Sequence, residues 1–254
     1  MEFLHNGLPA RPIKTAPIKS LFKEPVIPQP KNISQTLLSM LARLNIAGFE
    51  FISKQYDHEV QANSVIKPLQ GLGQVNGEVT VVKPVFDSPQ AIALSQGLYP
   101  SYSEIDCYQM AGASIDTAIR NLVASGVKID KIALLDNFCW CSSNDPQRLY
   151  QLKQAAKACY DFTTAFETPF ISGKDSMFND FKGYDEKGSQ IKISILPTLL
   201  ISSVGIINDV LKTISIDVKF SGDLVYLLGE TKDELGGSEY FSMYKAIGNN
   251  IPEI

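Results

Sequence analysis

Several residue types are scarce in this chain of 254 residues, and each scarcity excludes a class of protein. Its two histidines, His5 and His58, are too few for a histidine-rich metal site. The four cysteines lack the paired C-x-x-C spacing of structural zinc sites, and we interpret them as reduced cytosolic thiols rather than a disulfide scaffold. The longest apolar run, residues 195–207, contains proline, threonine and serine and is too short to span a bilayer.

An excess of positive charge is also missing, because 23 Lys and Arg residues face 27 Asp and Glu residues, for a net charge of −4. A mildly acidic chain is poorly suited to non-specific nucleic-acid binding, so no nucleic-acid partner is expected. The first twelve residues lack the charged-then-apolar pattern of a signal peptide. We therefore expect no membrane partner and a cytoplasmic location. The 44% apolar share is enough for a core that needs no disulfides or metals.

Proline is concentrated at the N-terminus, where residues 1–30 hold six of the 14 prolines. Because proline fixes φ and removes a hydrogen-bond donor, residues 1–31 are interpreted as an extended linker, and its apolar residues indicate that it lies along a domain surface. Residues 32–230 are expected to form one domain. Residues 231–254 contain a glycine pair and a short predicted helix, and are interpreted as the start of a further, truncated domain.

Between these ends, helical and strand patterns alternate. Helical spacing predicts helices within 34–48, 108–124 and 146–166, the last with Asp145 as N-cap and Pro146 in its first turn. Apolar and β-branched runs predict strands at 79–82, 91–95, 132–135, 170–171, 199–207 and 224–228, with a hairpin tip at 184–190. Because the spacing is uneven and a hairpin appears late, we predict an α+β fold with a mixed-sheet layer rather than a doubly wound parallel sheet.

Two segments that follow predicted strands carry residues suited to ligand binding. Residues 172–176, Ser-Gly-Lys-Asp-Ser, combine a glycine that admits close backbone approach, a cation, an aspartate that can bind Mg²⁺ and a hydroxyl donor. The first glycine of a Walker A loop is missing, so an ordinary turn is the alternative. Asp136 follows another buried strand, a common place for a ligand contact; alternatively it caps a turn while Trp140 fills the core.

Three further segments have simpler interpretations. Asp116 and Arg120 are four residues apart on a predicted helix, which indicates a surface ion pair. His58 stands beside two acidic residues and is interpreted as a hydrogen-bonded structural histidine rather than a catalytic one. The glycine pair within residues 234–240 permits positive φ and predicts a turn.

Taken together and in order, eight segments resemble the phosphoribosylformylglycinamidine synthase family, whose members are also called formylglycinamide ribonucleotide amidotransferases. The segments are YDHEV at 56–60, SVIKPLQG at 64–71, GLYPSYSEIDCY at 97–108, AIRNLVASG at 118–126, LLDNFCW at 134–140, PFISGKDS at 169–176, PTLLISSVGI at 197–206 and LLGETKDELGGSEY at 227–240. The resemblance runs from residue 3 to residue 240, nearly the whole chain.

The resemblance implies a fold similar to the N-terminal domain of aminoimidazole ribonucleotide synthetase. The chain is similar to the first domain of the second of two homologous halves of the synthetase subunit. The implied reaction is a C–N ligation of de novo purine synthesis, in which ATP activates formylglycinamide ribonucleotide and ammonia displaces phosphate to give formylglycinamidine ribonucleotide. The catalytic histidine and most substrate contacts belong to the first half, so no catalytic residue and no activity are expected of this chain alone.

The resemblance also assigns roles to single residues. Asp136 and Gly173 fall where the family contacts ATP, and Ser176 where it contacts the substrate. Lys174 stands where some members carry a Mg²⁺-binding asparagine, and as a cation it is expected to contact ATP phosphate instead.

For Mg²⁺, the expected ligands are Asp175 and Asn121. Members usually carry a glutamate four residues before Asn121, and here that position is Thr117, a poorer ligand.

The implied partners are the homologous first half, whose sheet pairs with that of this domain, and a glutaminase subunit or domain that supplies ammonia from glutamine. Without the first half, the sheet is expected to expose an apolar face through which the chain forms a homo-oligomer. Thr117 and Lys174 keep an alternative open: a non-catalytic structural domain that pairs with its homologous half and supports the active site without binding nucleotide.

Overall fold

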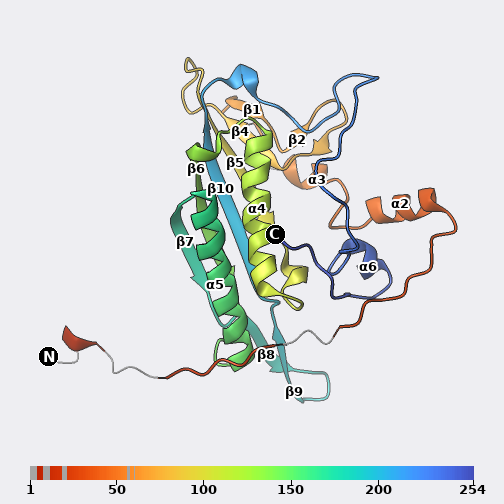
Figure 1. The fold of residues 1–254 in the computed structure, drawn as a ribbon, viewed down its shortest axis with the longest axis vertical. Coiled ribbons are helices and arrows are strands. Elements are labelled where there is room, and N and C mark those ends of the chain that lie inside the picture. Colours follow the sequence, from red (N-terminus) through yellow and green to blue (C-terminus); the bar gives the residue numbers. More distant parts are fainter. Residues whose placement is uncertain (1–4, 8–11, 19–21, 56–57, 60) are drawn as a thin grey trace.

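The centre of the fold is a six-stranded mixed sheet with two long helices on one face (Figure 1). The structure is a computed structural model and describes residues 5–7, 12–18, 22–55, 58–59 and 61–254. In spatial order the strands are β1 (Ser64–Ile66), β4 (Val79–Val82), β5 (Ala91–Leu98), β10 (Thr198–Ile207), β6 (Ile132–Cys139) and β7 (Phe170–Ser176). Only β6 and β7 pair in parallel; every other neighbouring pair is antiparallel. The predicted mixed-sheet α+β fold is therefore confirmed.

Two long helices, α4 (Cys107–Ala124) and α5 (Pro146–Phe166), cover the sheet. Both begin at an aspartate N-cap. The Asp106 carboxylate accepts hydrogen bonds from the first-turn amides of α4, and that of Asp145 does the same for α5, so each satisfies amides that lack a helical partner. Asp145 as N-cap and Pro146 in the first turn are both confirmed.

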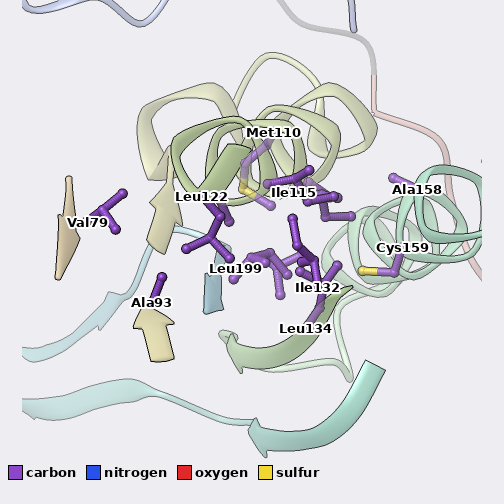
Figure 2. Packing of buried hydrophobic residues seen from close by; sticks show 14 of the residues in the cluster. Val79, Ala93, Met110, Ile115, Leu122, Ile132, Leu134, Ala158, Cys159 and Leu199 are labelled. Carbon is purple, nitrogen blue, oxygen red and sulfur yellow. The ribbon is translucent and has the colours of Figure 1, made fainter. Parts of the chain in front are cut away.

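The core lies between the sheet and these helices, because side chains alternate along each strand (Figure 2). Leu134 of β6 and Leu199 of β10 are fully buried beneath the helices. The closest approach of the two layers is at Gly97 of β5: an added Cβ there would lie 2.8 Å from the carbonyl carbon of Ser114 in α4. The absence of a side chain at this position therefore lets the helix rest directly on the strand.

The opposite face of the sheet is open. Leu94 and Leu98 of β5 and Ile206 of β10 point to this face and are each nearly half exposed. Among the described residues, both long helices lie on the other side (Figure 2). The predicted exposed apolar face is confirmed.

Shorter elements surround this layer. They are α2 (Ile33–Leu41), α3 (Glu50–Ser53), the β2 (Leu69–Gln70) and β3 (Val75–Asn76) pair, the β8 (Asp180–Tyr184) and β9 (Gln190–Ser194) hairpin, α6 (Glu239–Met243), and the 3₁₀ turns η1 (Pro100–Tyr102), η2 (Ile129–Lys131) and η3 (Val210–Lys212). The hairpin tip predicted at 184–190 is confirmed.

Within the predicted linker, described residues 12–18 and 22–31 form no helix or strand, whereas residues 5 and 6 are helical. Their surface contacts include a hydrogen bond from the Ala16 amide to the Pro146 carbonyl at the start of α5. Glu24 reaches the far end of the chain, where its Oε1 accepts hydrogen bonds from the amides of Asn249 and Asn250 at 2.9 and 2.5 Å. The first and last parts of the chain are thus held together.

One predicted strand is wrong. Residues 224–228, Leu-Val-Tyr-Leu-Leu, form no strand, and all five side chains are exposed by 77% or more. A strand needs a neighbour to accept its backbone hydrogen bonds, and no described residue pairs with this segment. An apolar, β-branched composition alone therefore gave a false prediction.

Other strands are longer than predicted, and β5 continues to Leu98 instead of ending at residue 95. β6 continues through Asp136 to Cys139, and β7 continues through the whole Gly-Lys-Asp-Ser segment to Ser176. The parallel register pairs Asp136 with Gly173 and Cys139 with Ser176. The interpretation of this segment as an ordinary turn is wrong, because pairing with β6 holds its backbone extended.

Candidate functional site

The predicted ligand-binding residues of β6 and β7 lie side by side on neighbouring strands, but they divide between the two faces of the sheet. Successive side chains of a strand point to opposite faces. Asp136 and Gly173 form a register pair on the helix-covered face. Lys174 and Ser176 point to the open face.

On the covered face, the Asp136 carboxylate lies directly over Gly173. A Cβ at Gly173 would be 2.9 Å from Asp136 Cγ, so only glycine leaves this space to the carboxylate. Asp136 Oδ1 is buried and finds no hydrogen-bond partner in the described part of the chain. Burial, and after it the nearby Asp175 carboxylate, raise the pKa of Asp136.

Cys159 of α5 lies in the packed core (Figure 2), and its thiol is close enough to Asp136 to be affected by the charge of that carboxylate. Burial, with a smaller effect of the Asp136 carboxylate, raises the pKa of this thiol to about 12. The thiol therefore stays protonated beside the carboxylate at neutral pH. Sequence reasoning missed Cys159 because helical spacing marks it only as a core position.

On the open face, Lys174 Nζ contacts Ser176 Oγ, two residues further along β7. The neighbouring strand adds Asn137, opposite Lys174, and Cys139, opposite Ser176. Cys139 Sγ lies 3.6 Å from Asn137 Oδ1. These four side chains form a polar cluster at the edge of the apolar face. The cluster combines a cation, an amide, a hydroxyl and a thiol.

Asn137 and Cys139 did not enter the candidate site from the sequence. Their spacing of two along β6 is the signal that could have found them, had the strand been predicted to continue that far.

Asn121 lies elsewhere, in a cavity of about 200 Å³ between α4 and the β2–β4 region, together with Gln70, Glu78 and Ser215. Its Nδ2 is buried and has no partner among the described residues. Asp175 does not line this cavity. The described residues contain no group of three or more His, Cys, Asp or Glu side chains arranged to hold a metal ion, so the pairing of Asn121 with Asp175 stays a prediction.

Most of the simpler interpretations are confirmed. Trp140 is fully buried and donates from Nε1 to the Arg148 carbonyl at 3.0 Å, which makes it a core residue. Asp136 lies within a strand, so its interpretation as a turn cap is wrong. Arg120 and Asp116 form the expected surface ion pair at 2.6 Å. The glycine pair forms a turn in which Gly237 has φ of +68°.

For the segment YDHEV, Tyr56, Asp57 and Val60 lie outside the described residues. The ring of His58 is placed with Nδ1 buried and without a hydrogen-bond partner among described residues, so the expected hydrogen bond is not found at this atom. Glu59 forms an ion pair with Lys67. These contacts do not connect His58 to the β6–β7 residues.

No helix in the described part of the chain combines the length and the apolar character needed to cross a membrane.

Comparison with known proteins extends these observations. No protein-family model matches the chain. Over 216 residues, 85% of its length, the chain is 36% identical to the PurL subunit of phosphoribosylformylglycinamidine synthase from Alkaliphilus metalliredigens. It is 33% identical over 225 residues to PurL of Methanocaldococcus jannaschii. The chain is a relative of PurL. The family resemblance of the eight segments is therefore confirmed.

The match covers only part of each PurL relative: 27% of the Alkaliphilus protein and 28% of the Methanocaldococcus protein, against 85% and 88% of this chain. The chain thus spans less than a third of the length of these relatives. Solved structures agree with the fold. PurLQS and ADP-complexed PurL, both from Thermotoga maritima, each superpose with a TM-score of 0.52 at 17% identity, over 80% of this chain and 28% of theirs. At this identity the likeness supports a shared mixed α+β fold.

Proposed function

We propose that this chain is one part of an ATP-dependent phosphoribosylformylglycinamidine synthase, located in the cytoplasm. The complete synthase would use ammonia derived from glutamine to convert formylglycinamide ribonucleotide to formylglycinamidine ribonucleotide. The observation that carries the proposal is the 36% identity to PurL over 85% of the chain. The Thermotoga relative is described as complexed with ADP and with AMPPCP, which supports ATP as the nucleotide.

The edge position of β7 supports a nucleotide contact here. β7 is the last strand of the sheet, so a ligand lying along its free edge would reach side chains of both faces. Gly173, whose side-chain space is filled by the Asp136 carboxylate, would contribute its backbone to the nucleotide contact, and Lys174 would neutralise phosphate charge. Ser176 would donate its hydroxyl to the formylglycinamide substrate. In phosphoryl transfer, positioning and charge neutralisation of this kind account for most of the rate enhancement.

Magnesium would be held by Asp175, next to Asp136. The two carboxylates lie close enough for Asp175 to raise the pKa of Asp136, and a bound cation would relieve that repulsion. Oxygen ligands of this type suit Mg²⁺, which would neutralise phosphate charge during transfer. Asn121 and Glu78 line a cavity that Asp175 does not reach. A metal contact of Asn121 would therefore be made at a separate position from that of Asp175.

The proposed partners follow from the open face of the sheet. Leu94, Leu98 and Ile206 would pack against the sheet of a homologous first half of the synthase, or against a second copy of this chain in its absence. Ammonia would come from a glutaminase partner. Residues 1–31 would act as linker, 32–230 as the synthetase-like domain, and 231–254 as the start of a further domain. The chain alone would be inactive.

One observation favours a second candidate, a structural domain that binds no nucleotide. Lys174 already contacts Ser176, and Asp136 lies on the other face of the sheet from both. In this case the domain would only support the paired half, and its polar residues would hold β7 in register.

An assembly assay separates the two candidates. ATP consumption is measured with formylglycinamide ribonucleotide and ammonium, for the chain alone and after adding the remaining parts of a PurL relative as separate polypeptides. We expect turnover only in the assembled mixture, and a loss of at least tenfold with Asp136→Asn. Asp116→Asn, a surface carboxylate in an ion pair, serves as the matched control and should leave turnover unchanged.

Full activity of the assembled Asp136→Asn mixture would favour the structural candidate. Robust turnover by the isolated chain would contradict the proposal that it is inactive alone.

A further inference from the structure

The β8–β9 hairpin carries two lysines directly opposite each other. The hairpin projects from one end of the molecule, away from the helices (Figure 1). Its antiparallel register pairs Lys182 with Lys192, which places both side chains on the same face. Like charges at directly opposed positions destabilise a strand pair, and a two-stranded ribbon has little stability in reserve. The arrangement therefore calls for a compensating negative charge.

One of the two opposed lysines is paired within the hairpin. Asp180 Oδ2 forms an ion pair with Lys192 Nζ at 3.3 Å, and the Asp180 side chain is only 3% exposed. The Ser194 hydroxyl and Lys192 hold the pKa of Asp180 below its usual range, so this carboxylate is ionised at neutral pH. Lys182 forms no ion pair with a described residue. Asp185 and Glu186 at the hairpin tip make the hairpin neutral as a whole, but neither of these described residues forms an ion pair with Lys182.

A cavity lies beside the two lysines. It measures about 490 Å³ and is lined by Lys182, Gly183, Tyr184, Gln190, Ile191 and Lys192. It is a depression open to solvent rather than an enclosed pocket, since residues of the exposed hairpin alone line it. Tyr184 and Gln190 form the next register pair on the lysine face, and the Tyr184 side chain is largely exposed. An aromatic ring and an amide thus adjoin the two ammonium groups.

We propose that this face of the hairpin binds a phosphate group, held by both lysines. A phosphate dianion presents several acceptor oxygens and can bridge two ammonium groups, whereas a carboxylate carries only one charge. The phosphate could be free or part of a nucleotide. In the second case the Tyr184 ring would stack on the base. The site is separate from β7 and does not depend on the function proposed above.

Equilibrium dialysis of the full chain tests this proposal, with radiolabelled inorganic phosphate and, separately, adenosine monophosphate at constant ionic strength. Lys182→Gln and Lys192→Gln should each weaken binding at least tenfold. Lys153→Gln, which removes an exposed lysine of α5, is the matched control and should stay within twofold.

The source of the phosphate follows from Tyr184→Leu. If this variant weakens only binding of the monophosphate, the site takes a nucleotide; if neither ligand is affected, the phosphate group alone is recognised. An absence of saturable binding to the unmodified chain would overturn the proposal. Equal weakening by Lys153→Gln would overturn it as well, because the binding would then reflect general charge.

Discussion

Replacing Gly97 with alanine tests the contact that joins the two layers of the fold. Gly97 lies in the middle of the sheet on β5, beneath α4. An alanine Cβ would lie 2.8 Å from the carbonyl carbon of Ser114 and closer still to its oxygen. The obstacle is helix backbone, which cannot rotate away as a side chain can. The layers would have to separate, or the strand would have to bend.

The size of the effect follows from this geometry. Ordinary van der Waals contact begins near 3.4 Å, so α4 must move by at least 0.6 Å relative to β5. Ten of the 18 residues of α4 are buried, and a rigid shift disturbs the packing of all of them. Overpacking of a core costs about 1–3 kcal/mol, and we expect the upper end, about 3 kcal/mol. At about 2–4 °C per kcal/mol, the unfolding midpoint should fall by about 6–12 °C.

Thermal unfolding of the full chain, followed by circular dichroism, measures this change. Gly48→Ala is the matched control, because a Cβ at Gly48 meets no atom within 4 Å. We expect that variant to stay within about 2 °C of the unmodified chain, since surface changes of this kind are worth about 0.5 kcal/mol or less. If the two variants unfold at the same temperature, the close packing of α4 on β5 does not limit stability, and the reasoning fails.

Three further predictions concern single side chains. Because burial and Asp175 raise the pKa of Asp136, the native state holds its proton to higher pH than the unfolded chain, so this residue lowers stability as the pH rises above 3.8. Asp136→Asn should therefore gain in unfolding midpoint relative to the unmodified chain between pH 3.5 and 7; a constant difference would contradict this. Ellman's reagent should modify Cys139 alone in the native protein and all four thiols in denaturant, since the other three are buried; rapid native labelling of Cys159 would refute its burial. Asp106→Ala removes the N-cap of α4 and should cost about 1 kcal/mol in urea unfolding, while Asp106→Asn should recover most of it.

Much of the fold was predictable because local signals and tertiary packing agree. In α5, helical spacing, Asp145 and Pro146 all predict the observed helix. The signals failed where pairing decides the structure. Gly173–Ser176 has the composition of a turn, yet it is extended because β6 lies beside it. Residues 224–228 have the composition of a strand, yet no described neighbour pairs with them.

The candidate site was predicted less completely for the same reason. Because Gly173, Lys174 and Ser176 are near neighbours in the sequence, they were predicted to contact the same bound ligands as Asp136. In a strand, consecutive residues cannot share a face, so Lys174 and Ser176 separate from Asp136 and Gly173. The distance between Asn121 and Asp175 in the fold could not be inferred, because it depends on how α4 crosses the sheet.

The hydrogen bonds of Glu24 have a consequence for the order of events during synthesis. The Glu24 carboxylate binds the amides of Asn249 and Asn250, more than two hundred residues further along the chain. A ribosome releases Glu24 early, long before its partners exist. The central layer can therefore form before Glu24 is bound, and this part of the first segment is secured only when the last residues have emerged. A chain interrupted before Asn249 would keep its sheet and helices but leave its proline-rich beginning unanchored at this point and open to proteases.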